Sequence, residues 1–269
     1  MDKECRSKEV EHVDEKEVIE LALDAGHILL ENGAEIFRVE ETIERICQHY
    51  GVNSENEFVL SNGIFITAGD DKERFFAKVE HIPVSGTHLD KVVAVNQLSR
   101  EIVRGKYTVA EARAEIARIK AEPGKKKWAL ILASGVGSAA FSYLFGGDMA
   151  DTFAAFIVGV LLYCYVLLFC VEHVRKLMTN ITGGILLTVL CGILYKIGIG
   201  NHPEFMVIGS IMPLIPGYAF TNAIREIADG DYISGSVRML DALLIFICIA
   251  IGVGLGVAFL ETTMGGVFL

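Results

Sequence analysis

The chain has 269 residues, of which 52% are hydrophobic and 22% charged, and its 34 acidic and 24 basic side chains give a net charge of −10. Such an acidic chain lacks the basic footprint of nucleic-acid-binding proteins, which excludes that class. Most charged residues lie before residue 128, and the remainder is strongly apolar. This composition predicts a soluble first half and a membrane-embedded second half.

The first 17 residues, MDKECRSKEVEHVDEKE, are acidic and lack the apolar core of a signal peptide. We interpret residues 1–14 as an acidic disordered tail. An α+β cytosolic domain is expected over residues 15–123, followed by an all-α polytopic membrane domain over residues 124–269.

Within the soluble half, apolar residues recur at helical spacing over residues 18–29 and 36–46, with a break at Asn32–Gly33 and Gly51 as a C-cap. Short strands are expected over residues 58–83, where Asn62–Gly63 is either a hairpin dipeptide or a bulge. Two more helices are predicted over residues 88–104 and 108–121, and Thr108 and Glu111 form a capping box at the start of the second. The predicted order is αα-β-αα.

Chemistry-bearing residues in the soluble half show no catalytic or metal-binding spacing. The histidines lack HxxxH or HExxH spacing, and the serines lack a GxSxG context, so we expect no metal, no cofactor and no enzymatic activity. The six cysteines fit buried small hydrophobic residues. A charged band surrounds the break between the first two helices, and it fits either helix-surface ion pairs or a contact surface against the membrane half. The band consists of Glu31, Glu35, Arg38, Glu40 and Glu41.

A transmembrane helix needs about 20 mostly apolar residues. Five stretches meet this condition, and they are expected at about residues 128–147, 152–172, 181–200, 205–223 and 240–260. Basic residues gather on one side of these spans: Lys125, Lys126 and Lys127 before the first, Arg175 and Lys176 after the second, and Arg225 and Arg238 around the last loop. The positive-inside rule then places the N-terminus in the cytoplasm and the C-terminus outside, as expected for a multi-pass protein of the plasma membrane.

The fourth of these spans is interrupted. Its sequence, FMVIGSIMPLIPGYAFTNAIREI (205–227), carries Pro213, Pro216 and Gly217 in its middle. Proline removes a backbone donor and disrupts the preceding turn, so such a break in a membrane survives where protein or a water-filled cavity satisfies the backbone. Interrupted spans of this kind line solute sites in transporters, and transport is therefore the leading hypothesis.

Charged residues cluster at the end of this span and in the loop after it. The loop is either a solvated interfacial segment or a vestibule that presents Arg225 and Arg238 to an anionic or zwitterionic solute. A guanidinium group suits a carboxylate because its donors form a planar fork.

Four segments together resemble the N-terminal domain family of the threonine/serine exporters (ThrE-like). They are ENGAEIFRVEETIERI (31–46), SNGIFITAG (61–69), LDKVVAVNQLSREIVRGKYTVAEARAEIARI (89–119) and LIPGYAFTNAIREIADGDYISGSVRMLDALL (214–244). Among the family's split, two-component members, the chain is similar to the YjjP-like subunit of a succinate exporter. The resemblance covers about residues 15–260.

The resemblance implies export of small amino acids or dicarboxylates from the cytoplasm. It also implies a separate small multi-span membrane protein as partner, with a homo-oligomer as a further expectation. By resemblance, the solute-site or gating candidates are Pro213, Pro216, Gly217, Asn222 and Arg225, and the residues themselves add Arg238. Two alternatives stay open: a membrane-anchored enzyme with a hydrolase-like cytosolic domain, and a regulatory or scaffold subunit.

Overall fold

The computed structural model describes residues 14–52, 56–70, 73–82, 88–169 and 176–265. The chain divides into two compact units, the first formed by residues 1–124 and 222–238 and the second by residues 125–221 and 239–269. One border between the units follows residue 124, and residues 222–238, which the sequence places in the membrane domain, group with the first unit. The division into a cytosolic and a membrane domain stays a prediction. Nearly all of the expected acidic tail lies outside the described residues, as do Cys5, Cys170 and Arg175.

Two predicted helices form the centre of the first unit. Helix α1 (Glu15–Glu31) begins after Asp14, whose carboxylate accepts the Lys16 amide, and helix α2 is Ile36–His49. Between them Gly33 has φ 84°, a left-handed conformation that glycine adopts without strain. The Gly33 amide donates to the Leu30 carbonyl and the Ala34 amide to the Leu29 carbonyl, the pair of bonds that defines a Schellman motif.

A three-stranded antiparallel sheet covers one side of these helices. Its strands β1 (Asn56–Leu60), β2 (Gly63–Asp70) and β3 (Glu73–His81) pair in the order β1-β2-β3. Leu60 pairs with Gly63, so a hairpin and not a bulge is present, but its two loop residues are Ser61 and Asn62, and Gly63 is the first residue of β2. Alternate residues Val59, Ile64 and Ile66 are buried in the same core as α1 and α2.

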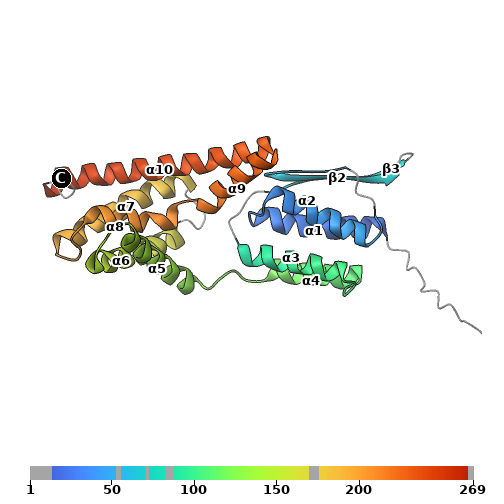
Figure 1. Ribbon diagram of the computed structural model, residues 1–269, viewed down its shortest axis with the longest axis horizontal. Helices are drawn as coiled ribbons and strands as arrows, with labels where there is room; N and C mark the ends of the chain where they lie inside the picture. The colour runs from blue at the N-terminus through green and yellow to red at the C-terminus, as the bar shows by residue number, and fades with distance from the viewer. Residues whose placement is uncertain (1–13, 53–55, 71–72, 83–87, 170–175, 266–269) are drawn as a thin grey trace, which may run out of the picture. The chain divides into compact units, whose positions relative to one another are not determined.

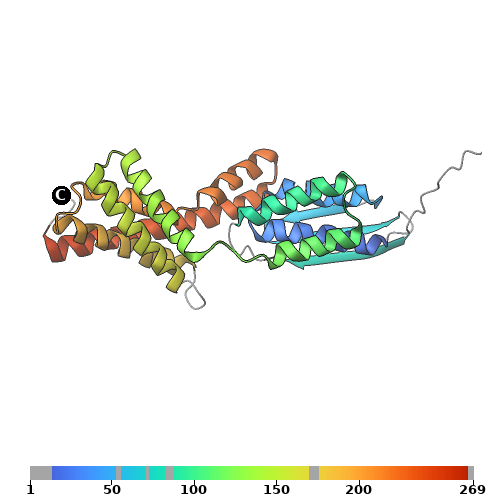
Figure 2. The ribbon, with the colours of Figure 1, turned by 90° about the horizontal axis from the view of Figure 1, so that it is seen from below.

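Helices α3 (Leu89–Val103) and α4 (Val109–Ala121) complete the first unit. They cover the side of α1 and α2 that faces away from the sheet, so the unit has three layers (Figures 1 and 2). The predicted capping box is present: Thr108 Oγ1 accepts the Glu111 amide, and the Glu111 carboxylate accepts the Thr108 amide. The αα-β-αα order is therefore confirmed for the described residues.

The second unit consists of apolar helices. They are α5 (Lys127–Leu144), α6 (Met149–Phe169), α7 (Lys176–Lys196), α8 (Pro203–Ile211) with the short 3₁₀ turn η1 (Met212–Leu214), the start of α9 (Gly217–Asp229) and most of α10 (Tyr232–Met264). Small residues bring α5 close to α6, and Ser134 Oγ donates to the Gly159 carbonyl at 2.9 Å. Cys191 and Cys248 are buried, as expected for small apolar side chains, whereas Cys164 is only partly buried.

Three of the described helices are long and apolar enough to cross a membrane: Met149–Leu168 in α6, Leu177–Lys196 in α7 and Tyr232–Thr263 in α10. The pair Pro203–Leu214 and Gly217–Asp229 adds a fourth if its two parts form one bent span. Helix α5, which corresponds to the expected span 128–147, is not among them, and it carries the buried serines Ser134, Ser138 and Ser142 along one side. A fifth crossing therefore stays a prediction.

Helix α10 approaches α7 so closely that only glycine fits at the crossing. A Cβ added to Gly252 would lie 2.2 Å from the Ile181 carbonyl oxygen, whereas one added to Gly254 would meet no atom within 4 Å. We therefore expect Gly252→Ala to destabilise the folded protein by about 1–3 kcal/mol, because the backbones must separate. The thermal unfolding midpoint of the detergent-solubilised protein measures this loss. The control Gly254→Ala should unfold like the wild type, and equal midpoints for the two variants would contradict the close approach.

Candidate functional site

The expected break in the fourth span is present. Helix α8 ends at Ile211, η1 follows, and α9 begins at Gly217, so that the helix direction turns by 63°. Ile215 is extended with ψ 124°, the conformation that a residue before proline prefers. Pro213 lies within η1, and Pro216 and Gly217 lie where α9 starts. The three sequence candidates therefore mark the bend.

Immediately after the bend, α9 and the start of α10 hold the turn between α1 and α2. Asn222 Nδ2 donates to the Gly33 carbonyl at 3.1 Å, and Arg238 Nη2 donates to the Ala34 carbonyl at 3.1 Å. Glu226 Oε1 accepts the Ile36 amide at 3.3 Å. We call the side chains of Asn222, Glu226 and Arg238, together with the turn Gly33–Ile36, the clasp; all of it belongs to the first unit.

An ion pair lies at the centre of the clasp. Arg238 Nη1 is 3.2 Å from Glu226 Oε1, and the two side chains are only 10% and 2% exposed. Glu226 Oε2 and Arg238 Nε have no hydrogen-bond partner among the described residues. Burying charges costs free energy that a close pair offsets only when other hydrogen bonds also satisfy it. The clasp is therefore sensitive to the loss of either partner.

Glu226 also acts as the cap of a helix far away in the sequence. Glu35, the residue before α2, makes no capping hydrogen bond with its own side chain. The amide of Ile36, the first of α2, donates instead to the carboxylate of Glu226, which lies 190 residues later in the sequence. A carboxylate at a helix N-terminus is favoured by the exposed amide groups and by the helix dipole. The start of α2 thus depends on α9.

The structure gives the three polar sequence candidates partners within the protein. Asn222 and Arg238 bind backbone carbonyl groups, and Arg225, which is half exposed, pairs through Nη1 with Glu35 Oε1. Contact of these side chains with a solute therefore stays a prediction. Sequence reasoning missed Glu226 as a site residue, although its position four residues after Asn222 places both on one face of α9.

Other members of the predicted charged band have simple roles. Glu41 pairs with Arg38 and Arg45 on the surface of α2, as the helix-surface interpretation predicts. Glu40 Oε1 accepts the Val59 amide of the sheet at 3.4 Å, and burial raises the pKa of the Glu40 carboxyl. Glu35 is the member that contacts the segment 222–238, through Arg225. The helix-surface interpretation is therefore confirmed for Arg38 and Glu41, whereas a contact with the membrane half stays a prediction, because segment 222–238 groups with the first unit.

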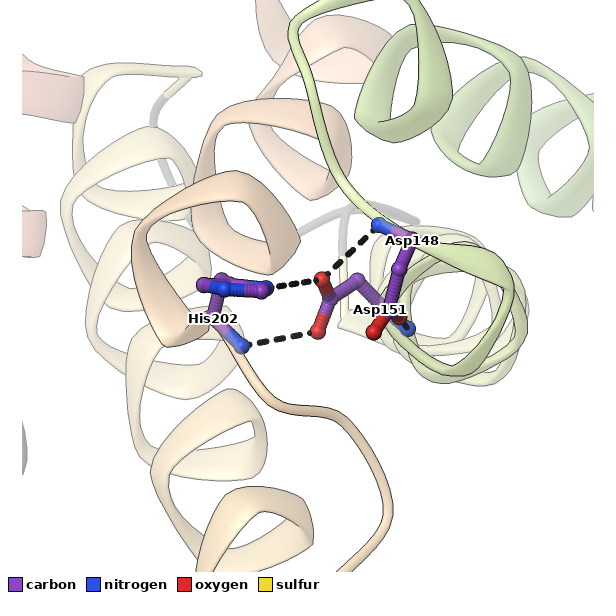
Figure 3. A group of neighbouring side chains, drawn as sticks. All are labelled: Asp148, Asp151 and His202. Atoms are coloured by element: carbon purple, nitrogen blue, oxygen red, sulfur yellow. Dashed lines mark hydrogen bonds and ion pairs between the residues drawn. The ribbon is translucent and has the colours of Figure 1, made fainter.

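A second cluster lies where α6 starts, next to the loop before α8 (Figure 3). Asp148 and Asp151 cap α6 reciprocally, because each carboxylate accepts the other residue's amide. Asp151 Oδ1 also accepts the Asn201 and His202 amides, and its Oδ2 lies 2.9 Å from His202 Nδ1. The Asp151 side chain is fully buried. This carboxylate thereby ties two separate loops of the second unit together.

The ligand atoms of Asp148, Asp151 and His202 lie within 4.8 Å of one another, close enough to hold a metal ion. However, each oxygen of Asp151 already accepts two hydrogen bonds, three of the four from backbone amides. A cation would have to displace these donors, which also hold the loops in place. We therefore interpret the cluster as a structural tie. The hydrogen bond with Asp151 raises the pKa of His202 above its ordinary value.

The buried ion pair gives a first test of the site. Arg238→Ala would leave the charge of Glu226 buried and unpaired, so we expect the free energy of unfolding to fall by about 3–5 kcal/mol. Arg225→Ala removes an ion pair whose arginine is 54% exposed, and a loss of only about 0–1 kcal/mol is expected. Thermal unfolding of the purified protein compares the two variants.

The double variant Glu226→Leu/Arg238→Met is the control for lost charge. It removes both charges while keeping apolar volume, so its midpoint should lie above that of Arg238→Ala. A midpoint for Arg238→Ala equal to that for Arg225→Ala would show that the ion pair is not buried in solution.

The Asp151–His202 pair predicts a pH dependence of stability. Because the pKa of His202 is raised in the folded state, its contribution is complete below about pH 6.5 and is lost as the pH rises through the raised pKa. We expect the thermal midpoint of the wild type to decrease over this interval. In His202→Gln this part of the decrease should be absent; an unchanged pH profile in that variant would contradict the assignment.

Comparison with known proteins agrees with this architecture. A family model described as "Putative threonine/serine exporter" (ThrE) matches residues 20–260. The "Probable succinate transporter subunit YjjP" of Escherichia coli is 21% identical over 243 residues, which are 89% of this chain and 93% of that protein. "Pheromone-regulated membrane protein 10" of Eremothecium gossypii is 26% identical over 234 residues, 84% of this chain.

The fungal relatives are much longer than the matched region. This chain spans 31% of the Eremothecium gossypii protein and 22% of an uncharacterised protein of Schizosaccharomyces pombe, with which it shares 25% identity over 185 residues. No solved structure matches the chain. Since the family model covers nearly all of the sequence, the chain belongs to the threonine/serine exporter (ThrE) family.

Proposed function

We propose that the chain is a subunit of a membrane exporter that moves small amino acids of the threonine/serine type, or dicarboxylates of the succinate type, out of the cytoplasm. The family description and the name of the bacterial relative support a transporter of this kind and do not favour the enzyme alternative. That relative is named a subunit, which supports a separate membrane protein as the partner of this chain. The observation that carries the proposal is the 63° break between Pro203–Leu214 and Gly217–Asp229.

The proposed exporter lies in the plasma membrane with five spans, the N-terminus in the cytoplasm and the C-terminus outside. In this arrangement the break lies within the membrane, where half-helix ends can contact a solute. Pro213, Pro216 and Gly217 keep the helix open, because proline cannot continue the hydrogen bonding of the preceding turn. Asn222, Arg225 and Arg238 follow the break on its cytoplasmic side.

We assign gating to the clasp. Helix α9 starts at the break and carries Asn222 and Glu226, which hold the turn Gly33–Ile36. A change of bend at Pro216–Gly217 would move this helix, and the clasp must then move with it or open. In the exporter, Pro216–Gly217 would act as a hinge with two bend angles. The contacts of the clasp with the cytosolic domain would stabilise one of these angles. A regulatory or scaffold role without a solute path would leave the break without a function.

The test uses cells loaded with a dipeptide source of threonine and serine and, separately, cells that produce succinate. Each carries this gene alone, a gene for a partner similar to the family's small membrane subunit alone, or both. We expect export with both genes and not with either alone. Export by the partner alone would reduce this chain to an accessory, and the absence of any solute flux would contradict the exporter proposal.

Within that assay, Pro216→Ala tests most directly whether the helix break is needed for export. Alanine restores a backbone N–H donor at position 216 and therefore favours a continuous helix. If the substitution stabilises the straight helix relative to the bent one by about 1.4 kcal/mol, the export rate should fall about tenfold. Pro203→Ala is the matched control, since proline at the first position of α8 is compatible with a helix and its loss should change export little. Both variants must reach the membrane in wild-type amount. Equal export rates would remove the break from the mechanism.

A further inference from the structure

The helix break leaves amide groups at the start of α9 without partners. The first hydrogen bond of α9 runs from the Phe220 amide to the Pro216 carbonyl. The amides of Tyr218 and Ala219 precede this bond and have no acceptor among the described residues. The start of α9 therefore presents two free backbone donors.

The chain before the break has carbonyl groups without donors. Pro216 has no N–H group, and the Gly217 amide donates to the Ile215 carbonyl at 2.9 Å. Among the described residues, the carbonyl groups of Pro213 and Leu214 therefore accept no amide from the chain that follows. The hydrocarbon of a bilayer offers backbone groups no hydrogen bonds, so a break inside a membrane needs polar groups or water at these positions.

One face of α7 lies against the break, within the same second unit. A Cβ added to Gly183 would lie 3.4 Å from Leu214 Cδ1, and Cys191 Sγ lies 3.9 Å from Ser210 Oγ. These contacts show that α7 and α8 run antiparallel. Thr179 is one turn before Gly183 on the same face of α7, so it lies at the level where α9 begins.

The hydroxyl of Thr179 is buried and unused. Thr179 is only 4% exposed, and its Oγ1 has no hydrogen-bond partner among the described residues. Thr188 on the same helix is also buried, but its Oγ1 donates to the Gly184 carbonyl at 2.8 Å. A buried hydroxyl without a partner costs free energy, which a bound polar ligand can recover. Thr179 thus adds a third free polar group beside the two ends of the break.

The charges around the break indicate which solute fits. Neither residues 177–195 of α7 nor residues 205–221 around the break include a charged side chain. The N-terminus of a helix carries a partial positive charge and the C-terminus a partial negative charge. The break places the start of α9 beside the end of α8 and η1, so both partial charges occur at one place. A carboxylate and an ammonium group on one solute match this pair, whereas a dianion meets no cation along these segments.

We propose that these groups are the solute site, and that the site takes a small zwitterion with a carboxylate and an ammonium group in preference to a dicarboxylate. The amides of Tyr218 and Ala219 and the hydroxyl of Thr179 bind the carboxylate. The carbonyl groups of Pro213 and Leu214 bind the ammonium group, as unwound carbonyls bind cations in other broken helices. This assignment rests on the proposed export function, and its test separates the two.

The test compares Thr179→Val with the control Thr188→Val in the full-length protein, reconstituted with its partner subunit in liposomes. In Thr179→Val the L-threonine concentration for half-maximal transport should rise about tenfold or more, because a hydrogen bond to a charged group is lost. Thr188→Val should transport like the wild type. The thermal midpoint of Thr179→Val should not fall, since its hydroxyl has no partner in the chain. Equal transport by all three proteins, or a lower midpoint for Thr179→Val, would overturn the site and leave the exporter in place.

Competition against radioactive L-threonine identifies the charge type of the solute. Threonine methyl ester lacks the carboxylate, β-hydroxybutyrate lacks the ammonium group, and succinate carries two carboxylates. Each should compete at least about tenfold more weakly than unlabelled L-threonine, because one end of the break then has no partner. Succinate that competes as well as L-threonine, or is transported when L-threonine is not, would overturn the zwitterion assignment. A wild-type complex that transports neither solute would contradict the exporter proposal itself.

Discussion

The buried ion pair between Glu226 and Arg238 is the interaction on which the clasp and its turn depend. One carboxylate oxygen of Glu226 accepts from the arginine and also from the first amide of α2, while the same arginine holds the carbonyl of Ala34. The Schellman motif at the end of α1 directs these backbone groups outward, and α9 and α10 supply the side chains that satisfy them. The end of one helix and the start of the next are thus determined by residues about 190–200 positions away.

In the proposed mechanism, helix α9 connects the helix break to the clasp. Helix α9 starts at Gly217, directly after the proline pair, and its second and third turns carry Asn222 and Glu226. A helix of this length transmits a change of direction at its first residue to its last. The gating proposal therefore requires two states of the bend and a clasp that favours one of them.

Much of the fold follows from local rules that the sequence displays. The helical periods, the Thr108–Glu111 capping box and the proline break depend on neighbours within a few residues, and each is where those rules predict it. The hairpin turn is also present, one residue earlier than the Asn62–Gly63 dipeptide indicates. The partners of Asn222 and Arg238 could not be predicted in this way, since their acceptors are backbone carbonyls and every residue has one. The role of Asp151 could not be predicted either: its side chain is fully buried, and four donors from two separate segments converge on its carboxylate. Long-range polar contacts of this kind produce no periodic pattern in the sequence from which they could be predicted.

Hydrogen exchange at the amides of Ile36 and the next residues of α2 measures the state of the clasp most directly. The protein should be examined in lipid bilayers together with its partner, with and without the transported solute. If the clasp gates the helix break, exchange at these amides must change when solute is present, and the change must disappear in Pro216→Ala. If the complex exports the solute and exchange at these amides is the same with and without it, the clasp only holds the first unit together and the gating account is contradicted.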